Sequence, residues 1–440
     1  MRVARLLAVL LLLVAAPARA QTFVVDTTAD AVDLDPGDGI CDVDPTSAEI
    51  CALRAAVMEA NALGGGVIEL PPGLYRLILP GIESAGQAGD LDVHVPISIL
   101  GSGVGVTTIE QTYGDRVLHV WNGGELHLDN LTVSGGHAGA IGGSDLGGAI
   151  RNLGTVQLTD VELTGNHAAI GGAIFNVGHV SATRVHVWGN TAEQHAGGIA
   201  SASTSASGGA GTTLILTDST IGPNTAPGVA ELELANAASA TLVNVTIAPA
   251  DPSSLSLSIG NQEVVLAHVT MRGWMYAFSF HGDDPLTFVN SAIERCEFGS
   301  GPFPITRAGV NASSDASCGF AAAGGIEGDL KLGALADHGG PMPTLLPAAG
   351  SPLIDAASDA ECPSHDQRGV VRPQDGDGVG GARCDIGAVE VRPEEVPEPG
   401  ALAASLAALA ALSALARGRR TARGAGGPPG RGGRGIRQGP

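Results

Sequence analysis

An eight-residue pattern recurs seven times along the chain, at intervals of 22 to 34 residues. The copies are LHLDNLTV, VQLTDVEL, VSATRVHV, LILTDSTI, ATLVNVTI, VVLAHVTM and LTFVNSAI, which begin at residues 126, 156, 180, 214, 240, 264 and 286. The first, third and eighth positions are apolar in every copy, and the second, fourth and seventh are mostly polar or small. This alternation predicts short strands that bury one face.

The alternation loses its phase between the third and the eighth position, so a bend must interrupt each strand. The fifth position supplies residues that tolerate left-handed backbone, because Asn and Asp adopt that conformation more readily than other non-glycine residues. They are Asn130, Asp160, Asp218, Asn244 and Asn290, with Arg184 and His268 as exceptions. We expect these side chains to stack from copy to copy and to hydrogen-bond along the stack.

A unit of this length with two or three short strands and no helical pattern is expected to coil, with each coil hydrogen-bonded to the next. The sequence therefore predicts an all-β fold, a right-handed parallel β-helix over residues 66–324 that resembles the solenoid of pectate lyases. Gly147-Gly148-Ala149-Ile150 and Gly171-Gly172-Ala173-Ile174 are expected to begin another strand of successive coils. Gly197-Gly198-Ile199 echoes them. With LTGN ending at Asn166 and VWGN ending at Asn190, they resemble the GGAI and FxxN repeats of polymorphic outer-membrane β-helix proteins.

The N-terminal part of the mature chain, residues 21–65, is expected to cap the first coil, since an uncovered coil end exposes unpaired strand edges. Residues 51–61, CALRAAVMEAN, predict a short amphipathic helix with Leu53, Val57 and Ala60 on one side. The first coil strand is expected in GGVIEL directly after it. The helix resembles the CSLREAI motif near the start of many exported bacterial β-helix proteins, through Cys51, Leu53, Arg54, Ala56, Glu59 and Asn61.

Residues 325–392 resemble the choice-of-anchor Q domain, whose members end in varied sorting signals. The resemblance is carried by LADHGGP from residue 335, GSPLID from 350, DQRG from 366 and CDIGAVE from 384. His338 and Met342 depart from the usual Asn and Thr of that pattern. The resemblance implies a C-terminal region that precedes a cell-envelope anchor.

The two ends of the chain predict export and tethering. Residues 1–20 have the charged start, apolar run and small residues at the cleavage site of a signal peptide. Pro397, Glu398 and Pro399 precede seventeen small or apolar residues at 400–416 and an arginine cluster, and the segment 393–420 resembles the PEP-CTERM sorting signal. It predicts a membrane helix and processing by an exosortase-like protease after signal peptidase. The Gly/Arg-rich residues 421–440 are expected to be disordered.

Charge and cysteines narrow the environment and the partners. All 45 acidic residues lie between residues 21 and 399, so this part is more negative than the chain's formal charge of −22. Nucleic acid is therefore not an expected partner, because phosphate binding needs clustered Lys and Arg.

Six cysteines form three pairs of sequence neighbours, and export permits disulfides. The expected pairs, each outside the regular repeat, are Cys41 with Cys51, Cys296 with Cys318, and Cys362 with Cys384.

The loop Asp33-Leu34-Asp35-Pro36-Gly37-Asp38 spaces carboxylates as a calcium loop does. An acidic surface turn is the favoured interpretation, because no glutamate follows at the spacing that an EF-hand requires. Asp375-Gly376-Asp377-Gly378 allows the same two interpretations. The fold requires no cofactor, and Ca²⁺ is the ion that Asp33, Asp35 and Asp38 would take.

The stretch WMYAFSF places four aromatic residues, Trp274, Tyr276, Phe278 and Phe280, on one face of a strand. Burial of large aromatic side chains favours the core. An outward position would instead make Trp274 and Tyr276 a platform for sugars.

Near these aromatics, His281, Asp283 and Asp284 are expected in a turn, with Arg272, Glu294 and Arg295 on neighbouring coils. Paired carboxylates are what glycoside hydrolysis requires, whereas turn residues are the simpler interpretation. The sequence thus favours an envelope-tethered surface protein with a structural, adhesive or matrix role. The alternative is a polysaccharide lyase or glycoside hydrolase acting on an extracellular polysaccharide.

Overall fold

The computed structural model describes residues 21–46, 50–81, 84–139, 145–202, 211–235, 238–260, 263–278, 285–299 and 304–395. The predicted signal peptide, the Pro-Glu-Pro motif at 397–399, the membrane helix at 400–416 and the turn residues His281, Asp283 and Asp284 lie outside the described residues. Of the helices within them, none combines the length and hydrophobicity that a bilayer span requires.

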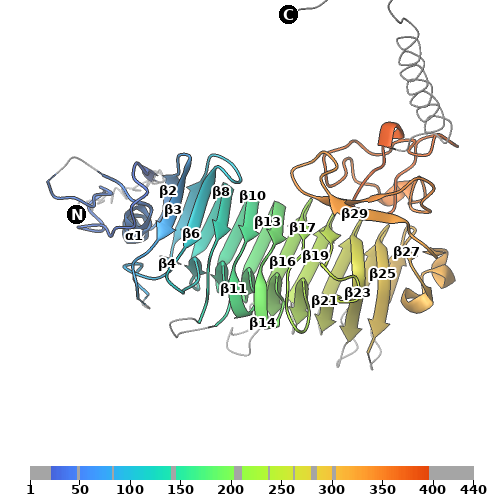
Figure 1. The fold of residues 1–440 in the computed structure, drawn as a ribbon, viewed down its shortest axis with the longest axis horizontal. Coiled ribbons are helices and arrows are strands. Elements are labelled where there is room, and N and C mark those ends of the chain that lie inside the picture. Colours follow the sequence, from blue (N-terminus) through green and yellow to red (C-terminus); the bar gives the residue numbers. More distant parts are fainter. Residues whose placement is uncertain are drawn as a thin grey trace, which may run out of the picture.

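The chain winds through three faces in turn, and each strand pairs in parallel with its equivalents on the coils before and after it, as Figure 1 shows. The first face is built from β1 (Gln21–Val24), β2 (Gly66–Glu69), β5 (Pro96–Leu100), the first halves of β8 (Glu125–Ser134), β10 (Thr155–Thr164) and β13 (His179–Trp188), then β16 (Thr212–Thr217), β19 (Ala238–Val243), β22 (Glu263–Ala267), β24 (Leu286–Val289) and β26 (Ile305–Ala308).

The second face takes β3 (Gly73–Leu77), β6 (Thr107–Gln111), the second halves of β8, β10 and β13, then β17 (Thr220–Ile221), β20 (Thr246–Ile247), the starts of β23 (Thr270–Phe278) and β25 (Ala292–Phe298), β27 (Ala312–Ser313) and β28 (Ile326–Glu327). The third face takes β4 (Leu91–Val93), β7 (Leu118–Val120), β9 (Ile150–Asn152), β12 (Ile174–Asn176), β15 (Ile199–Ala202), β18 (Leu232–Ala235), β21 (Leu255–Gly260) and the ends of β23 and β25. This order is that of a parallel β-helix.

The strand register confirms the alignment of the seven copies. The first position of each copy pairs with the first position of the next, from Leu126 through Val156, Val180, Leu214, Ala240 and Val264 to Leu286. The apolar positions lie in one continuous core that runs along the coils. Ile150, Ile174 and Ile199 also pair in register, so the GGAI segments do begin the strands of the third face.

The bend at the fifth position has left-handed backbone in all seven copies. The φ angles are 56° at Asn130, 51° at Asp160, 53° at Arg184, 49° at Asp218, 53° at Asn244, 51° at His268 and 46° at Asn290. The expected stacking occurs between neighbouring copies. Arg184 Nη2 lies 2.6 Å from Asp160 Oδ2, and Asn244 Nδ2 donates to Asp218 Oδ1 over 2.9 Å.

The Gly-Gly pairs allow the coils to approach closely. Gly147 and Gly171 have φ angles of 67° and 68°, and a Cβ on Gly148 would lie 2.3 Å from the carbonyl oxygen of Gly172. Only glycine satisfies both conditions, because other residues rarely adopt positive φ and their Cβ would collide with the next coil.

A buried ladder of asparagines runs through three successive coils. Asn166 Nδ2 donates to Asn190 Oδ1, and Asn190 Nδ2 donates to Asn224 Oδ1, over 2.9 Å each. The ladder ends at Glu231, a fully buried carboxyl that accepts from the backbone and the side-chain nitrogens of Asn224. Buried polar groups are thereby paired within the turns, as a low-dielectric interior requires.

The N-terminal cap contains helix α1 (Leu53–Leu63), as expected, but it differs from the prediction in two ways. The helix does not have one buried side, because every residue from Leu53 to Ala60 is buried. Arg54 is among them and pairs with Asp30, with 2.6 Å between Nε and Oδ1. In addition, β1 already belongs to the first face, since Gln21–Val24 pairs with Gly66–Glu69. The residues between β1 and α1 therefore cover the outer side of the helix.

Residues 330–395 lie against the side of the later coils and do not continue the stack (Figure 1). Their β29 (Leu332–Ala336) and β30 (Thr344–Pro347) form an antiparallel pair. Gln367 reaches the second face, donating to Thr220 Oγ1 and accepting from Thr246 Oγ1, over 2.6 Å each. This region thus covers the stacked bend residues from Asn244 to Asn290. The side-chain nitrogens of Asn244 and Asn290 donate to the backbone carbonyl oxygens of His365 and Ser358.

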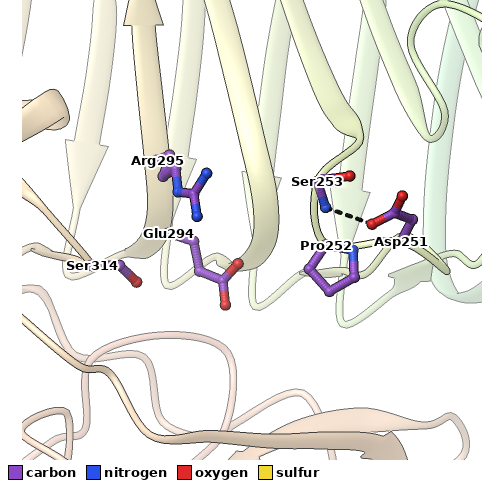
Figure 2. A pocket seen from close by; sticks show the side chains of 6 residues that line it. All are labelled: Asp251, Pro252, Ser253, Glu294, Arg295 and Ser314. Carbon is purple, nitrogen blue, oxygen red and sulfur yellow. Dashed lines mark hydrogen bonds between the residues drawn. The ribbon is translucent and has the colours of Figure 1, made fainter.

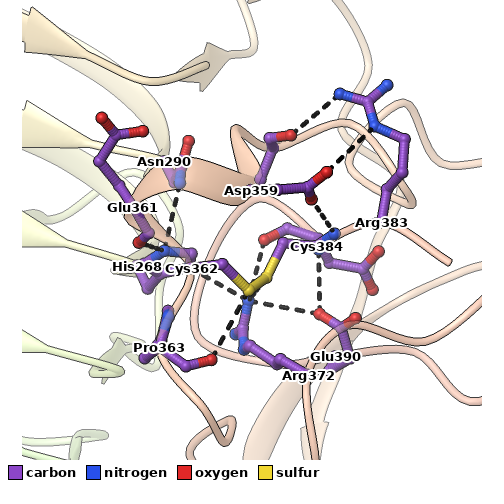
Figure 3. The surroundings of a disulfide bond; sticks show 12 residues. His268, Asn290, Asp359, Glu361, Cys362, Pro363, Arg372, Arg383, Cys384 and Glu390 are labelled. Atoms are coloured by element: carbon purple, nitrogen blue, oxygen red, sulfur yellow. Dashed lines mark hydrogen bonds and ion pairs between the residues drawn. A yellow bond between two sulfur atoms is a disulfide. The ribbon is translucent and has the colours of Figure 1, made fainter.

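All three disulfides pair sequence neighbours, as predicted. The expectation that they lie outside the repeat is wrong for one of them. Cys296 is on β25 within a regular coil, and it is joined to Cys318 in the short 3-10 helix η1 (Ala316–Cys318). Cys362 and Cys384 lie in the C-terminal region, beside His268 and Arg372 (Figure 3).

Candidate functional site

Strand β23 turns its aromatic side chains outward, which corrects the prediction that they fill the core. Met275 and Ala277 are buried in the core, whereas Trp274, Tyr276 and Phe278 are half-buried on the outer side of the third face. The register explains the direction, because Met275 pairs with the core residues Leu257 and Cys296 on the adjoining coils. Phe280 lies outside the described residues.

Two adjoining hollows lie beside this aromatic strand. The first, of about 450 Å³, is lined by Asp251, Pro252, Ser253, Glu294, Arg295 and Ser314, as Figure 2 shows. The second, of about 230 Å³, is lined by Ser253, Trp274, Arg295, Cys296, Glu297 and Ser317. Ser253 and Arg295 line both hollows, which together form one groove, here called the Trp274 groove.

The indole of Trp274 has a fixed orientation in this groove. Its Nε1 donates to the carbonyl oxygen of Ser253 over 3.0 Å. Its register partner on the next coil is Arg295, whose exposed guanidinium has no hydrogen-bond partner among the described residues. Tyr276 continues the row with Glu297 as its register partner, and its ring lies 5.6 Å from that of Phe278. The groove thus combines an aromatic wall with charged and hydroxyl groups.

Residues 251–253 form a turn that faces Glu294 and Arg295 across the groove, and Asp251 holds this turn. Its Oδ1 accepts from the backbone nitrogen of Ser253 over 2.9 Å (Figure 2). This hydrogen bond lowers the pKa of Asp251, which is fully exposed. The carboxylate is therefore ionised at neutral pH and is suited to accept hydrogen bonds from a ligand.

Arg272 and Glu294, predicted on neighbouring coils, do come together, but other contacts occupy them. Arg272 Nε lies 3.6 Å from Glu294 Oε1. Arg272 Nη2 also donates to the carbonyl oxygens of Leu332 and Gly333 in the C-terminal region, over 3.0 and 2.7 Å. Glu294 Oε2 accepts from the backbone nitrogen of Gly273 over 2.8 Å. Both side chains therefore fix the coils to each other and to β29.

The proposed calcium loop is closed by a carboxylate of the helix. Glu59 accepts from the backbone nitrogens of Gly37 and Gly39, so these N–H groups point at an anion. Asp33 is buried, and its pKa is raised to about 6, by burial first and then by Glu59 and Asp38. Among the described residues, the sets of three metal-ligand atoms within 4.8 Å of one another lie elsewhere, so Asp33, Asp35 and Asp38 do not form such a set.

One set of close ligand atoms is Asp90, Asp92 and His119, all buried on the outer side of the third face. Arg116 Nη1 lies 3.3 Å from Asp90 Oδ2, and Trp121 Nε1 donates to Asp92 Oδ1 over 2.6 Å. Asp90 and Asp92 thus already have partners within the fold, and we assign no metal to them. Burial, with Asp92 and Asp115 nearby, raises the pKa of Asp90.

The other set comprises Asp355, Asp375 and Asp377, which include the second calcium-like turn of the sequence. Asp355 accepts from the backbone nitrogens of Gly376 and Asp377 over 3.3 and 3.0 Å, which is the bonding pattern of a stabilised turn. Acidic groups at partly exposed turns need no ion. We therefore derive no metal site from this cluster.

The groove can position a ligand more readily than it can transform one. It offers an aromatic face, an arginine, serine hydroxyls and carboxyl groups, which is the mixture that binds polar rings. Comparison of the chain with protein-family models, with curated proteins and with solved structures finds no match.

Proposed function

We propose that this protein is an exported, envelope-tethered surface protein, a right-handed parallel β-helix that binds extracellular polysaccharide in an adhesive or matrix role. Export and tethering rest on the sequence resemblances at the two ends of the chain. The N-terminal cap and the laterally docked C-terminal region support a static body.

The observation that carries the binding role is the outward row of Trp274 and Tyr276 beside the Trp274 groove. An indole that is half-buried and held by Ser253 loses little conformational freedom when a sugar ring stacks on it. Arg295, Ser253 and Ser317 line the same hollow as the indole, Ser314 lines the adjoining one, and these groups match the hydroxyl groups of a saccharide.

Hydrolysis or elimination within the same groove is the second candidate, because Asp251 and Glu297 place further carboxylates around Arg295. The commitments of Arg272 and Glu294 to structural contacts argue against it. Lys331, the sole lysine of the chain, donates to the carbonyl oxygen of Gly350 in the C-terminal region and is likewise engaged.

The test compares the full chain with Trp274→Ala, purified in mild detergent, by co-sedimentation with insoluble polysaccharides and by release of reducing ends or unsaturated sugars. We expect the wild type to bind and to release nothing, and Trp274→Ala to weaken binding about tenfold. Tyr113→Ala is the matched control, since Tyr113 is an exposed aromatic on another coil.

Two results would contradict the binding role. One is unchanged binding by Trp274→Ala when Tyr113→Ala is also unchanged. The other is release of sugar products that Asp251→Asn or Glu297→Gln abolishes, which would establish the enzymatic alternative.

A further inference from the structure

An acid, a histidine and a tryptophan are arranged in the same way at two separate places on the coils. The sequence repeats His-Val-Trp in LHVW, which ends at Trp121, and in VHVW, which ends at Trp188. In each case the acid lies on the preceding coil, in register with the histidine. The register pairs are Asp92 with His119 and Glu162 with His186.

The bonding is the same in the two places. Trp121 Nε1 donates to Asp92 Oδ1 over 2.6 Å, and Trp188 Nε1 donates to Glu162 Oε1 over 2.7 Å. The histidine Nδ1 lies 3.7 Å from the acid in the first place and 3.9 Å from it in the second. In both, the histidine ring packs on the indole, with centroids 4.1 and 5.7 Å apart. The tryptophan is therefore held in a defined orientation both times.

The two places differ in what covers the indole. Around Trp121 the acid is fully buried, His119 is 3% exposed, and the ring of His94 also stacks on the indole at 5.6 Å. Trp188 is 38% exposed, and within the described residues His186 is the one ring stacked on it. Packing explains the first arrangement, whereas the second presents an oriented aromatic face to solvent.

The surroundings of Trp188 leave this face accessible. On the preceding coil its register partner is Thr164, a small hydroxyl residue. On the following coil the neighbouring residue is Gly222, whose N–H donates to the carbonyl oxygen of Val187. Glycine has no side chain that could cover the indole. Glu162 is held in place by Thr132 Oγ1 at 3.2 Å. The register partner of His186 on the following coil is Thr220, whose hydroxyl already donates to the carbonyl oxygen of Pro343 in the C-terminal region.

We propose that Trp188 and Glu162 form a second binding site for a neutral polysaccharide, which with the Trp274 groove makes the protein a cross-linker of polysaccharide chains. This inference rests on the proposed binding function. An oriented indole beside a carboxylate and threonine hydroxyls suits the apolar face and the hydroxyl groups of a pyranose ring. The chain's charge of −22 disfavours polyanionic glycans.

Cross-linking follows from the positions of the two sites. Trp188 is on the second face and Trp274 on the third face of the coils. A single polysaccharide chain lying along one face reaches one site, so a molecule with both sites occupied holds two chains or two distant segments. Bridging of this kind needs both sites and is lost when either is removed, while binding persists.

The experiment uses the full chain in mild detergent with soluble β-1,3-glucan, dextran and mannan, and with polygalacturonate as the charged comparison. Co-sedimentation or affinity electrophoresis reports binding, and turbidity and viscosity report cross-linking. The variants are Trp188→Ala, Glu162→Ala, Trp274→Ala and the double Trp188→Ala/Trp274→Ala, with Tyr113→Ala as control. Light scattering of the free protein establishes that each variant has the wild-type mass.

We expect the wild type to cross-link one of the neutral glycans, most strongly at an intermediate ratio of protein to glycan. Trp188→Ala, Glu162→Ala and Trp274→Ala should each bind with about tenfold lower apparent affinity and lose cross-linking. The double variant should do neither. Cross-linking by Trp188→Ala at the wild-type level, or loss of all binding in Trp274→Ala alone, would overturn this inference and leave the groove as the binding site. Absence of binding by the folded wild type would overturn the proposed function as well.

Discussion

Arg372 donates from Nη1 to Nδ1 of His268 over 3.1 Å and so joins the C-terminal region to a bend of the coils. Since a guanidinium can only donate, Nδ1 is the acceptor and Nε2 carries the proton. Nε2 lies 2.9 Å from the carbonyl oxygen of Glu361, to which it donates (Figure 3). The neutral imidazole thus serves both partners, which explains why His268 replaces the Asn or Asp of other bends.

The C-terminal region should loosen in mild acid because of this histidine. Burial, and next the guanidinium of Arg372, lower the pKa of His268 to about 4. His268 is protonated near pH 6.5 in the unfolded chain but only near pH 4 in the folded chain. The free energy of unfolding therefore decreases as the pH falls from 6.5 towards 4. The expected loss is about 2 kcal/mol by pH 5 and about 3 kcal/mol by pH 4. Urea unfolding at pH 7.5, 6 and 5 measures it.

The matched variant is His268→Asn, which keeps a residue suited to left-handed backbone but cannot titrate. It should be less stable at pH 7.5, since it loses the bonds to Arg372 and Glu361, and its stability should change less between pH 7.5 and 5. Buried His119 and His186 titrate in both proteins and cancel in the comparison. Parallel pH profiles of variant and wild type would exclude His268 as the cause.

Glu231 predicts the opposite pH dependence. Burial raises its pKa to about 8, although Asn224 donates to it. The unfolded carboxyl ionises near pH 4.5, so the stability associated with the protonated folded form is lost as the pH rises from 4.5 through 8. The full effect is about 5 kcal/mol. Glu231→Gln, compared with exposed Glu125→Gln, should be more stable than wild type at pH 9 and nearly equal at pH 5. Equal stabilities at pH 9 would contradict this.

The left-handed backbone at the bends predicts that Asn130 can be replaced by glycine but not by a β-branched residue without loss of stability. This residue is exposed and has a φ angle of 56°. Asn130→Val should destabilise the protein by about 1–2 kcal/mol, because a β-branched residue in this conformation clashes with its own backbone, whereas Asn130→Gly should be nearly neutral. His127→Val, three residues earlier on the same strand β8, is the control, and urea unfolding at pH 7.5 is the measurement. A fully stable Asn130→Val would refute the strain argument.

The sequence predicts the coils well because their determinants are local. A break in two-residue periodicity requires a bend, and the bend requires residues that tolerate positive φ, so the column from Asn130 to Asn290 could be found. The direction of Trp274 was predicted wrongly although a signal existed. Counting by twos from the core residue Met271 places Gly273, Met275 and Ala277 inward, and Trp274 therefore outward.

The docking of the C-terminal region could not be predicted in this way. Gln367 meets Thr220 from 147 residues away, and no periodicity links two such positions. The acid–histidine–tryptophan arrangement was missed for a related reason. Glu162 and His186 become neighbours only through the register of β10 and β13, although the repeated His-Val-Trp was visible in the sequence.

The segment that contains Cys318 and Phe320 covers the core at the last coils. The disulfide between Cys296 and Cys318 is expected to hold this cover in place. Cys318 is fully buried, and Phe320, two residues further on, packs edge-on against the core ring of Phe288 with centroids 5.1 Å apart. Cys296→Ala/Cys318→Ala should lower stability by about 3 kcal/mol, since the bond closes a 22-residue separation. A loosened cover also exposes strand edges, which favour pairing between molecules. Light scattering should therefore show self-association of this variant but not of Cys362→Ala/Cys384→Ala, whose disulfide lies off the coil end. A monomeric variant of wild-type stability would show that packing of Phe320 alone holds the cover.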